Sequence, residues 1–196
     1  MRQQLSLDEK NDQIRSLLEG LDRRVPGEGA HAERVAVYAT ATGYEMGLRG
    51  EELQQLRYAA TLHDVGKTSL DPGPLLRIGP LSDVERKQMQ AHVTLAEALV
   101  GAIDWLKPCI SAIRHHHERW DGRGYPDALS GEKIPIFSRI IAVSESFDAM
   151  TLLSPGREAL SDEQAGDELQ KESGGQFDPL VVQAFLKVQP IIQPIR

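Results

Sequence analysis

Residues 63–67 read HDVGK, and residues 115–126 read HHHERWDGRGYP. These two stretches contain four of the six histidines in the chain, and the other two are His31 and His92. Neutral imidazole is the commonest side-chain ligand of divalent transition metals, and carboxylates beside it suit zinc, iron and manganese. A lone histidine on an apolar helix face is more often a hydrogen-bonded core residue. The clustering reverses those odds and indicates a metal site.

The composition is that of one globular domain of 196 residues. A net charge of −7 argues against a nonspecific nucleic-acid binder, although bound metal ions could still attract an anionic substrate. The single Cys109 excludes an intramolecular disulfide, and the N-terminus lacks the apolar core of a secretory signal. No apolar run approaches the roughly 20 residues that cross a bilayer. We therefore expect a soluble, cytoplasmic domain without a membrane partner.

The hydrophobic periodicity predicts helices and no strand of alternating pattern. The expected helices cover residues 7–21, 31–46, 51–65, 82–100, 109–117, 136–153, 161–171 and 179–187. Ser82 followed by Glu85 forms a capping box, and Asp178 before Pro179 is a typical helix start. Gly66 is expected to end the third helix as a C-terminal glycine stop. The predicted fold is all-α, a multi-helix bundle in which ligands converge from several helices.

The helix expected at residues 136–153 has apolar residues all around its axis, which predicts a central, buried position. Glu145 and Asp148 lie inside it, and a buried carboxylate is costly unless it is paired or bound to metal. A metal and Arg139 are the candidate partners.

His63 and Asp64 are adjacent, so on a helix they project about 100° apart. At a helix end they could contact two neighbouring metals, or Asp64 could bridge them. Two metals roughly 3.5 to 4 Å apart lower the pKa of a bridging water and neutralise charge on a phosphoryl group. Phosphodiester cleavage is therefore the natural chemistry of this arrangement.

The two motifs resemble those of the HD-GYP domain family. The likeness continues through residues 31–35, His92, residues 134–140, residues 147–149 and residues 175–179, and it covers roughly residues 31 to 185. The resemblance implies an HD-domain-like helical bundle and a bacterial phosphodiesterase. Such an enzyme hydrolyses cyclic di-GMP to pGpG or GMP with a metal-activated water. It also implies two divalent transition-metal ions, iron or manganese first, with zinc and nickel as further possibilities.

Carried over to this chain, the resemblance implies two ligand sets that share Asp64. The first metal would be held by His31, His63, Asp64 and Glu145, and the second by Asp64, His92, His116 and His117. His115 would lie just outside the ligand shell. Catalytic roles fall to Asp64 and to Lys67, which would stabilise a phosphate oxygen. The alternative for Lys67 is a lysine that complements the dipole at a helix end.

The expected substrate-binding residues are Lys67, Arg123, Tyr125 and Arg157. Tyr125 and Pro126 also shape their loop, which could contact a protein partner of the diguanylate-cyclase type. Trp120 could either stack on a guanine or pack in the core. Residues 1–24 are interpreted as an amphipathic helix that either mediates a homodimer or caps the bundle. Residues 25–190 form the phosphohydrolase domain, and residues 191–196 form a tail.

This chain departs from the family pattern at several positions. Glu145 stands where members usually have aspartate, and Gly27 replaces the glutamate of members with three metals, which favours two metals. Residues 154–157 read SPGR, where Arg-Pro-Tyr-Arg is usual. Two alternatives to the phosphodiesterase therefore stay open. One is a metal-stabilised module that binds cyclic di-GMP or a protein, and the other is a hydrolase of another nucleotide.

Overall fold

The computed structural model describes residues 5–75, 77, 79–153 and 158–192, and within these ranges every named element is helical. The α-helices are α1 (Leu7–Arg24), α2 (Glu28–Glu45), α3 (Gly50–Leu62), α4 (Pro72–Leu75), α5 (Asp83–Gln90), α6 (His92–Gly101), α7 (Ile110–Arg114), α8 (Ile136–Thr151), α9 (Asp162–Lys171) and α10 (Pro179–Val188). The 3₁₀ helices are η1 (Val65–Ser69), η2 (Asp104–Cys109), η3 (Gly131–Lys133) and η4 (Gln189–Ile191). The all-α prediction is confirmed.

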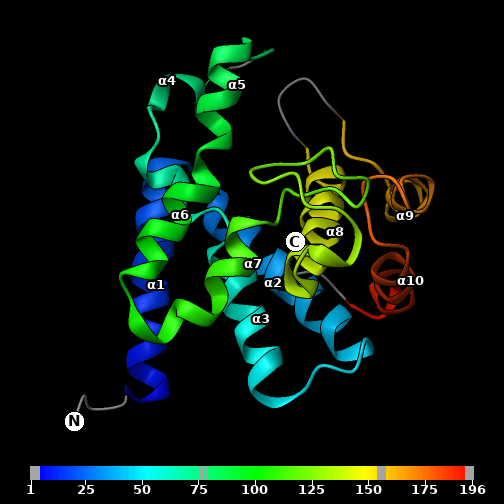
Figure 1. Cartoon of the computed structure of the whole chain (residues 1–196), viewed down its shortest axis with the longest axis horizontal. Coiled ribbons are helices and arrows are strands. Elements are labelled where there is room, and N and C mark those ends of the chain that lie inside the picture. Colours follow the sequence, from blue (N-terminus) through cyan, green and yellow to red (C-terminus); the bar gives the residue numbers. More distant parts are fainter. Residues whose placement is uncertain (1–4, 76, 78, 154–157, 193–196) are drawn as a thin grey trace.

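Helix α8 is central, as its apolar pattern predicts. Ile140, Ile141 and Phe147 are fully buried, and the helix packs against α2, α7, α9 and α10 (Figure 1). The ring of Phe147 contacts Tyr38 of α2 and Phe185 of α10, with centroids 5.2 and 5.0 Å apart. These aromatic contacts join three helices that are far apart in the sequence.

Helix α1 packs against α2, α3 and η1. Ile14 and Leu21 are buried, and Leu17 and Leu18 pack against the core cluster. Ser6 caps the helix in a capping box with Glu9. Much of the apolar stripe is therefore used within the chain itself. Within the described ranges, no helix combines the length and the apolar character needed to cross a bilayer.

The predicted glycine stop at Gly66 is wrong. Helix α3 already ends at Leu62, and Gly66 lies inside η1, which packs on α6. A Cβ atom at this position would lie 1.9 Å from the carbonyl oxygen of His92 and 2.5 Å from the amide nitrogen of Ala96. Glycine is needed here because two backbones touch.

The single helix predicted at residues 82–100 is divided into α5 and α6, which meet at Ala91. The capping box of Ser82 and Glu85 is confirmed. Between η1 and α5, Pro72 begins the short helix α4. Figure 1 shows α4 and α5 extending together away from the body of the bundle. The division at Ala91 places His92 at the start of α6.

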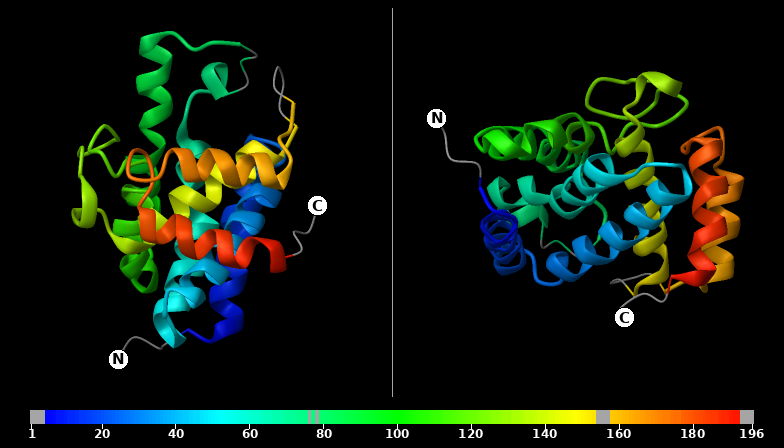
Figure 2. Two further views of the ribbon diagram at one scale, coloured as in Figure 1. Left: turned by 90° about the vertical axis from the view of Figure 1, so that its right-hand side faces the viewer. Right: turned by 90° about the horizontal axis from the view of Figure 1, so that it is seen from below.

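Helices α9 and α10 lie side by side along α8 (Figure 2). The caps predicted for α10 are present, since the Asp178 carboxylate accepts from the backbone amide of Leu180 and Pro179 is the first residue. The other carboxylate oxygen of Asp178 accepts from Arg139 of α8 at 2.6 Å. The prediction that Arg139 neutralises Asp148 is therefore wrong. Its partner is the capping residue of α10, which ties that helix to α8.

Candidate metal centre

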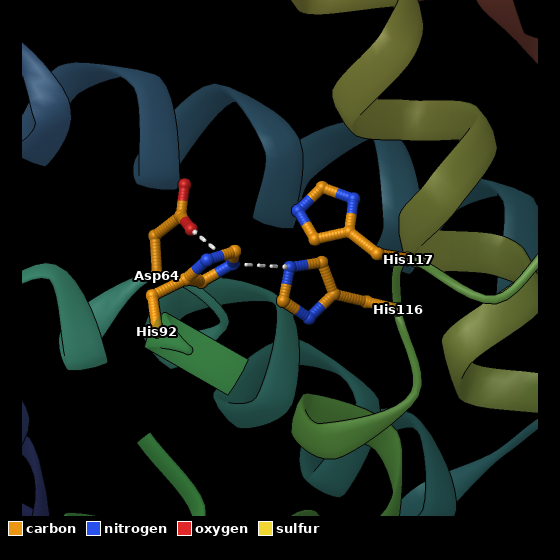
Figure 3. Close-up of side chains that lie close together, drawn as sticks. All are labelled: Asp64, His92, His116 and His117. Carbon is orange, nitrogen blue, oxygen red and sulfur yellow. Dashed lines mark hydrogen bonds and ion pairs between the residues drawn. The ribbon is translucent and has the colours of Figure 1, made fainter. Parts of the chain in front are cut away.

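The structure brings together all seven candidate ligands that the sequence predicts. They are His31 on α2, His63 and Asp64 between α3 and η1, His92 on α6, His116 and His117 after α7, and Glu145 on α8. One group contains His31, His63, Asp64 and Glu145. The other, shown in Figure 3, contains Asp64, His92, His116 and His117. Within each group the potential ligand atoms lie within 4.8 Å of one another.

Asp64 belongs to both groups and presents a different oxygen to each. Its Oδ2 lies 3.2 Å from Nε2 of His63 and 2.7 Å from Nζ of Lys67, whereas Oδ1 lies 3.3 Å from Nε2 of His92. Burial opposes ionisation of this carboxyl, but the positive charge of Lys67 and the contact with His63 hold its pKa well below the usual range. A buried, ionised carboxylate that faces two ligand groups has the geometry of a bridging ligand.

Three of the imidazoles are oriented by the backbone of their own helical turn. In each, Nδ1 lies 2.6–2.7 Å from the carbonyl oxygen three residues earlier: Ala60 for His63, Met89 for His92 and Ile113 for His116. A carbonyl oxygen can only accept, so Nδ1 carries the proton in each ring. In the neutral ring, Nε2 then presents its lone pair to the site, which is the usual arrangement of a metal-binding histidine.

Two of these Nε2 atoms lie close enough together to bind one cation. The Nε2 atoms of His92 and His116 are 3.4 Å apart, and burial lowers the pKa of both rings. Among the described residues, Nε2 of His63 and Oδ1 of Asp64 are buried without a hydrogen bond. Two ligand atoms on opposite sides of one ion are about 4 Å apart at ordinary metal–nitrogen distances. Divalent transition metals therefore fit both the chemistry and the spacing of these ligands.

His63 also shows that the site attracts positive charge. Burial opposes its protonation, but the Asp64 carboxylate and the more distant Glu145 outweigh that effect and raise the pKa of His63 to about 9. In the protein without metal this ring therefore already carries a second proton at neutral pH. A metal ion would replace that proton.

His31 is oriented differently, by a buried carboxylate on another helix. Its Nδ1 lies 2.7 Å from Oδ2 of Asp148, and Asp148 also accepts from Nε and Nη2 of Arg34 at 2.7 and 3.0 Å. Burial opposes ionisation of Asp148, but these hydrogen bonds lower its pKa overall. The partner required by this buried carboxylate is therefore Arg34, which the sequence interpretation did not consider.

Lys67 lies at the centre but is held by two carboxylates. Besides Asp64, its Nζ lies 3.0 Å from each carboxylate oxygen of Glu28, the first residue of α2. Burial opposes protonation, but Asp64 and Glu28 raise the pKa of Lys67, so it stays charged. The sequence interpretation did not consider the pairing of Lys67 with Glu28.

The loop of residues 115–131 supplies further predicted residues. Tyr125 stacks on His117, with ring centroids 4.9 Å apart and an interplanar angle of 27°. Arg123 is exposed on the same loop. His115 uses both ring nitrogens outside the two groups, with the Ser111 carbonyl at 2.8 Å and Asp127 at 2.9 Å. Trp120 lies beside Arg139, whose guanidinium is 5.7 Å from the ring centroid.

Arg157 lies outside the described residues, together with Ser154 and Gly156. Its predicted contact with substrate phosphate therefore stays a prediction.

The fold and the site define an all-helical domain with two histidine–carboxylate groups that share one aspartate. The profile of the family described as "HD domain" matches residues 15–181. The chain belongs to the HD domain family. Its motifs thus identified the family correctly.

Relatives with curated names are identical to this chain at about a third of the aligned positions. It is 34% identical over 196 residues to the cyclic di-GMP phosphodiesterase response regulator RpfG of Xanthomonas campestris, covering 97% of this chain and 52% of that protein. It is 32% identical to the 3'3'-cGAMP-specific phosphodiesterase 2 of Vibrio cholerae, covering 89% and 34%. The chain thus spans between a third and about half of the length of these relatives.

Solved structures share the fold. The cyclic GMP-AMP specific phosphodiesterase V-cGAP3 of V. cholerae superposes with a TM-score of 0.73 at 21% identity, covering 91% of this chain and 48% of that one. The HD domain of the phosphodiesterase PgpH of L. monocytogenes, in complex with cyclic di-AMP, gives a TM-score of 0.62 at 19% identity, covering 90% and 97%.

Proposed function

We propose that this chain is a metal-dependent phosphodiesterase that hydrolyses cyclic di-GMP to pGpG, GMP or both. The observation that carries the proposal is the buried Asp64 carboxylate, which faces one histidine group with each of its oxygens. The names of relatives that act on cyclic di-GMP or 3'3'-cGAMP support the substrate class. Two divalent ions, iron or manganese first, are the proposed cofactors.

The metal-binding role falls to the two groups that share Asp64. Ions bound there would activate a water molecule and neutralise the charge that develops on the phosphodiester. The imidazoles whose Nδ1 is held by a carbonyl or by Asp148 keep Nε2 available and need little reorganisation when they bind. We assign the ligand role to all seven residues of the two groups.

Lys67 is proposed to contribute positive charge to substrate binding. Its ammonium group lies 2.7 Å from Asp64 and remains protonated, and about a fifth of the side chain is exposed. A phosphate oxygen that approaches Asp64 would meet this charge, which stabilises the oxygen as the phosphodiester is cleaved. Glu28 holds the ammonium group in place before the substrate binds.

The position of Glu145 supports a role as metal ligand despite the departure from aspartate. Its carboxylate takes part in the group with His31, His63 and Asp64, although the side chain is one methylene longer than the usual aspartate. The substitution therefore keeps a carboxylate within the ligand group. A Glu145→Asp variant should retain metal binding and turnover.

A second candidate substrate is 3'3'-cGAMP, because a relative of nearly equal identity is specific for it. The test uses anaerobically purified protein loaded separately with Fe(II) and Mn(II). Cyclic di-GMP, 3'3'-cGAMP and cyclic di-AMP are each supplied, and the linear and mononucleotide products are separated by chromatography. The proposal is supported if cyclic di-GMP is cleaved with the highest kcat/KM of the three. If another dinucleotide is cleaved with a higher kcat/KM, that dinucleotide is the preferred substrate instead.

A protein that binds two metals and cleaves none of the three would contradict the enzymatic role. It would favour the binding module. In that case Glu145→Asp and Ser154→Arg, alone and together, should restore turnover if these departures disabled an ancestral enzyme. If neither does, the substitutions are not the cause.

A further inference from the structure

His117 differs from the other candidate histidine ligands in the way its ring is oriented. The other four rings have Nδ1 within hydrogen-bond distance of a carbonyl oxygen or of Asp148. For His117, no hydrogen bond to either ring nitrogen occurs in the described part of the chain. Its Nε2 lies 3.9 Å from Oε1 of Glu145, beyond hydrogen-bond distance. No hydrogen bond among the described residues therefore orients this ring.

Besides the neighbouring rings of His92 and His116, a further ring that packs against His117 is that of Tyr125. Its ring lies nearly parallel to that of His117, with centroids 4.9 Å apart, and it is roughly perpendicular to His92 at 6.5 Å. We propose that Tyr125 is a positioning residue that fixes the ring plane of His117 by stacking and thereby maintains the metal group of Asp64, His92, His116 and His117. This inference rests on the metal-binding role in the proposed function.

The backbone of the loop is built to place Tyr125 there. A Cβ atom at Gly124 would lie 2.4 Å from the amide nitrogen of Arg119 and 2.6 Å from the carbonyl oxygen of His117. The backbone amide of Tyr125 donates to that same carbonyl oxygen at 3.3 Å. The loop therefore lies directly on the backbone of its own histidine motif, and only glycine permits this approach. This backbone contact brings the ring of Tyr125 beside the ring of His117.

Glu118 secures the loop on the other side of Tyr125. Its buried carboxylate accepts from the backbone amides of Asp127 at 2.7 Å and Leu129 at 3.1 Å. The Asp127 side chain in turn pairs with Arg114, with both nitrogen–oxygen distances at 2.9 Å. Tyr125 is thus held between two anchored segments. From this position in the loop, its ring stacks on His117.

Metal titration tests this inference independently of catalysis. Metal-free wild-type protein, Tyr125→Leu and Tyr125→Phe are titrated with Mn(II), and free Mn(II) is followed by electron paramagnetic resonance. Removal of a group that orients a ligand typically weakens metal affinity about 10- to 100-fold. We expect Tyr125→Leu to weaken one of the two binding steps by at least about tenfold and to leave the other unchanged. Tyr125→Phe keeps the ring and should bind like the wild type.

A double-mutant cycle with His117→Ala separates positioning from general damage. If Tyr125 acts through His117, Tyr125→Leu causes no further loss of affinity when His117 is already alanine. Loss of affinity that persists in that background overturns the inference. So do a Tyr125→Leu variant that binds both ions normally and a Tyr125→Phe variant that is as impaired as Tyr125→Leu. Tyr125→Met, of similar volume without a ring, replaces Tyr125→Leu if the latter does not fold.

The same titration distinguishes this inference from the proposed function. One outcome is that the wild type binds two Mn(II) ions and the variants bind as expected, but the wild type cleaves no cyclic dinucleotide. That outcome contradicts the enzymatic role and leaves the positioning role intact. If the wild type cleaves the substrate but Tyr125→Leu binds metal normally, the enzymatic role is supported and the positioning role is contradicted. Wild-type protein that binds no Mn(II) in either step contradicts both.

Discussion

Replacing Gly66 with alanine should damage the fold and the metal centre together. The added Cβ atom would lie 1.9 Å from the carbonyl oxygen of His92 and 2.5 Å from the amide nitrogen of Ala96. Both are backbone atoms, so rotation of a side chain cannot relieve the overlap. Ordinary contact begins near 3.4 Å, so η1 and α6 must separate by about 1.5 Å, and even modest overpacking of a core costs about 1–3 kcal/mol.

We therefore expect Gly66→Ala to lower the free energy of unfolding by about 3 kcal/mol, the upper end of that range. The separation also displaces His92, the first residue of α6, from Asp64, the residue just before η1. A preorganised site tolerates displacements of only about 0.5 Å. Metal affinity of the group that contains His92 should fall at least about 100-fold, beyond the usual effect of losing an orienting contact.

The assay is urea unfolding of the metal-free protein, followed by Mn(II) titration of the same preparation. Gly20→Ala is the matched control. Gly20 lies within α1, and the nearest atom to an added Cβ is Nη2 of Arg23 at 4.0 Å. Alanine is preferred over glycine inside a helix by about 1 kcal/mol, so the control should be stabilised. If Gly66→Ala unfolds at the wild-type urea midpoint while Gly20→Ala behaves as expected, the packing argument for η1 and α6 is refuted.

Three further predictions concern the centre and the core. Asp64→Ala should lose both metals and all turnover while keeping its helical circular dichroism, because both groups share this carboxylate; two ions per chain by elemental analysis would contradict the bridging assignment. Asp148→Asn should weaken only the group that contains His31, by about 10- to 100-fold, because it removes the charge that faces Nδ1; equal loss in both binding steps of a Mn(II) titration would argue against it. Burial raises the pKa of Cys109 to about 12, whereas in the unfolded chain the thiol ionises near its ordinary value. The folded state therefore retains this proton as the pH rises above about 8.5, so stability should fall from that pH toward 12. A disulfide reagent at pH 8 should accordingly label Cys109 only in denaturant, and rapid labelling of the folded protein would show that the thiol is accessible.

The parts of the fold that the sequence predicts are those fixed by local patterns. The capping box of Ser82 and Glu85 and the cap of α10 at Asp178 are set by residues within one turn, and both are present. The burial of α8 follows from apolar residues around its axis. In each of these cases the information lies within a single element.

The predictions that were wrong depend on contacts between distant segments. Gly66 has the pattern of a helix stop, but the glycine is required by its contact with α6, which begins 26 residues later at His92. Arg139 is close to Asp148 in sequence, yet each pairs with a residue of another helix. Nothing in a single sequence shows which helix will lie opposite. Charge pairs between helices therefore could not be assigned.

The candidate ligands were found because their residue types are unusual at their positions, but the groups that orient them follow two different rules. His63, His92 and His116 sit at helix ends, where the carbonyl oxygen three residues earlier is within reach of Nδ1. Their orientation is thus encoded by placing a histidine in a terminal turn, which a sequence could in principle reveal. His31 depends on Asp148 and His117 on the ring of Tyr125, and both depend on how remote segments pack. Substitutions at Asp148 and Tyr125 should therefore each weaken one metal group, whereas changes that shift a helix end, as at Gly66, should also unfold the protein.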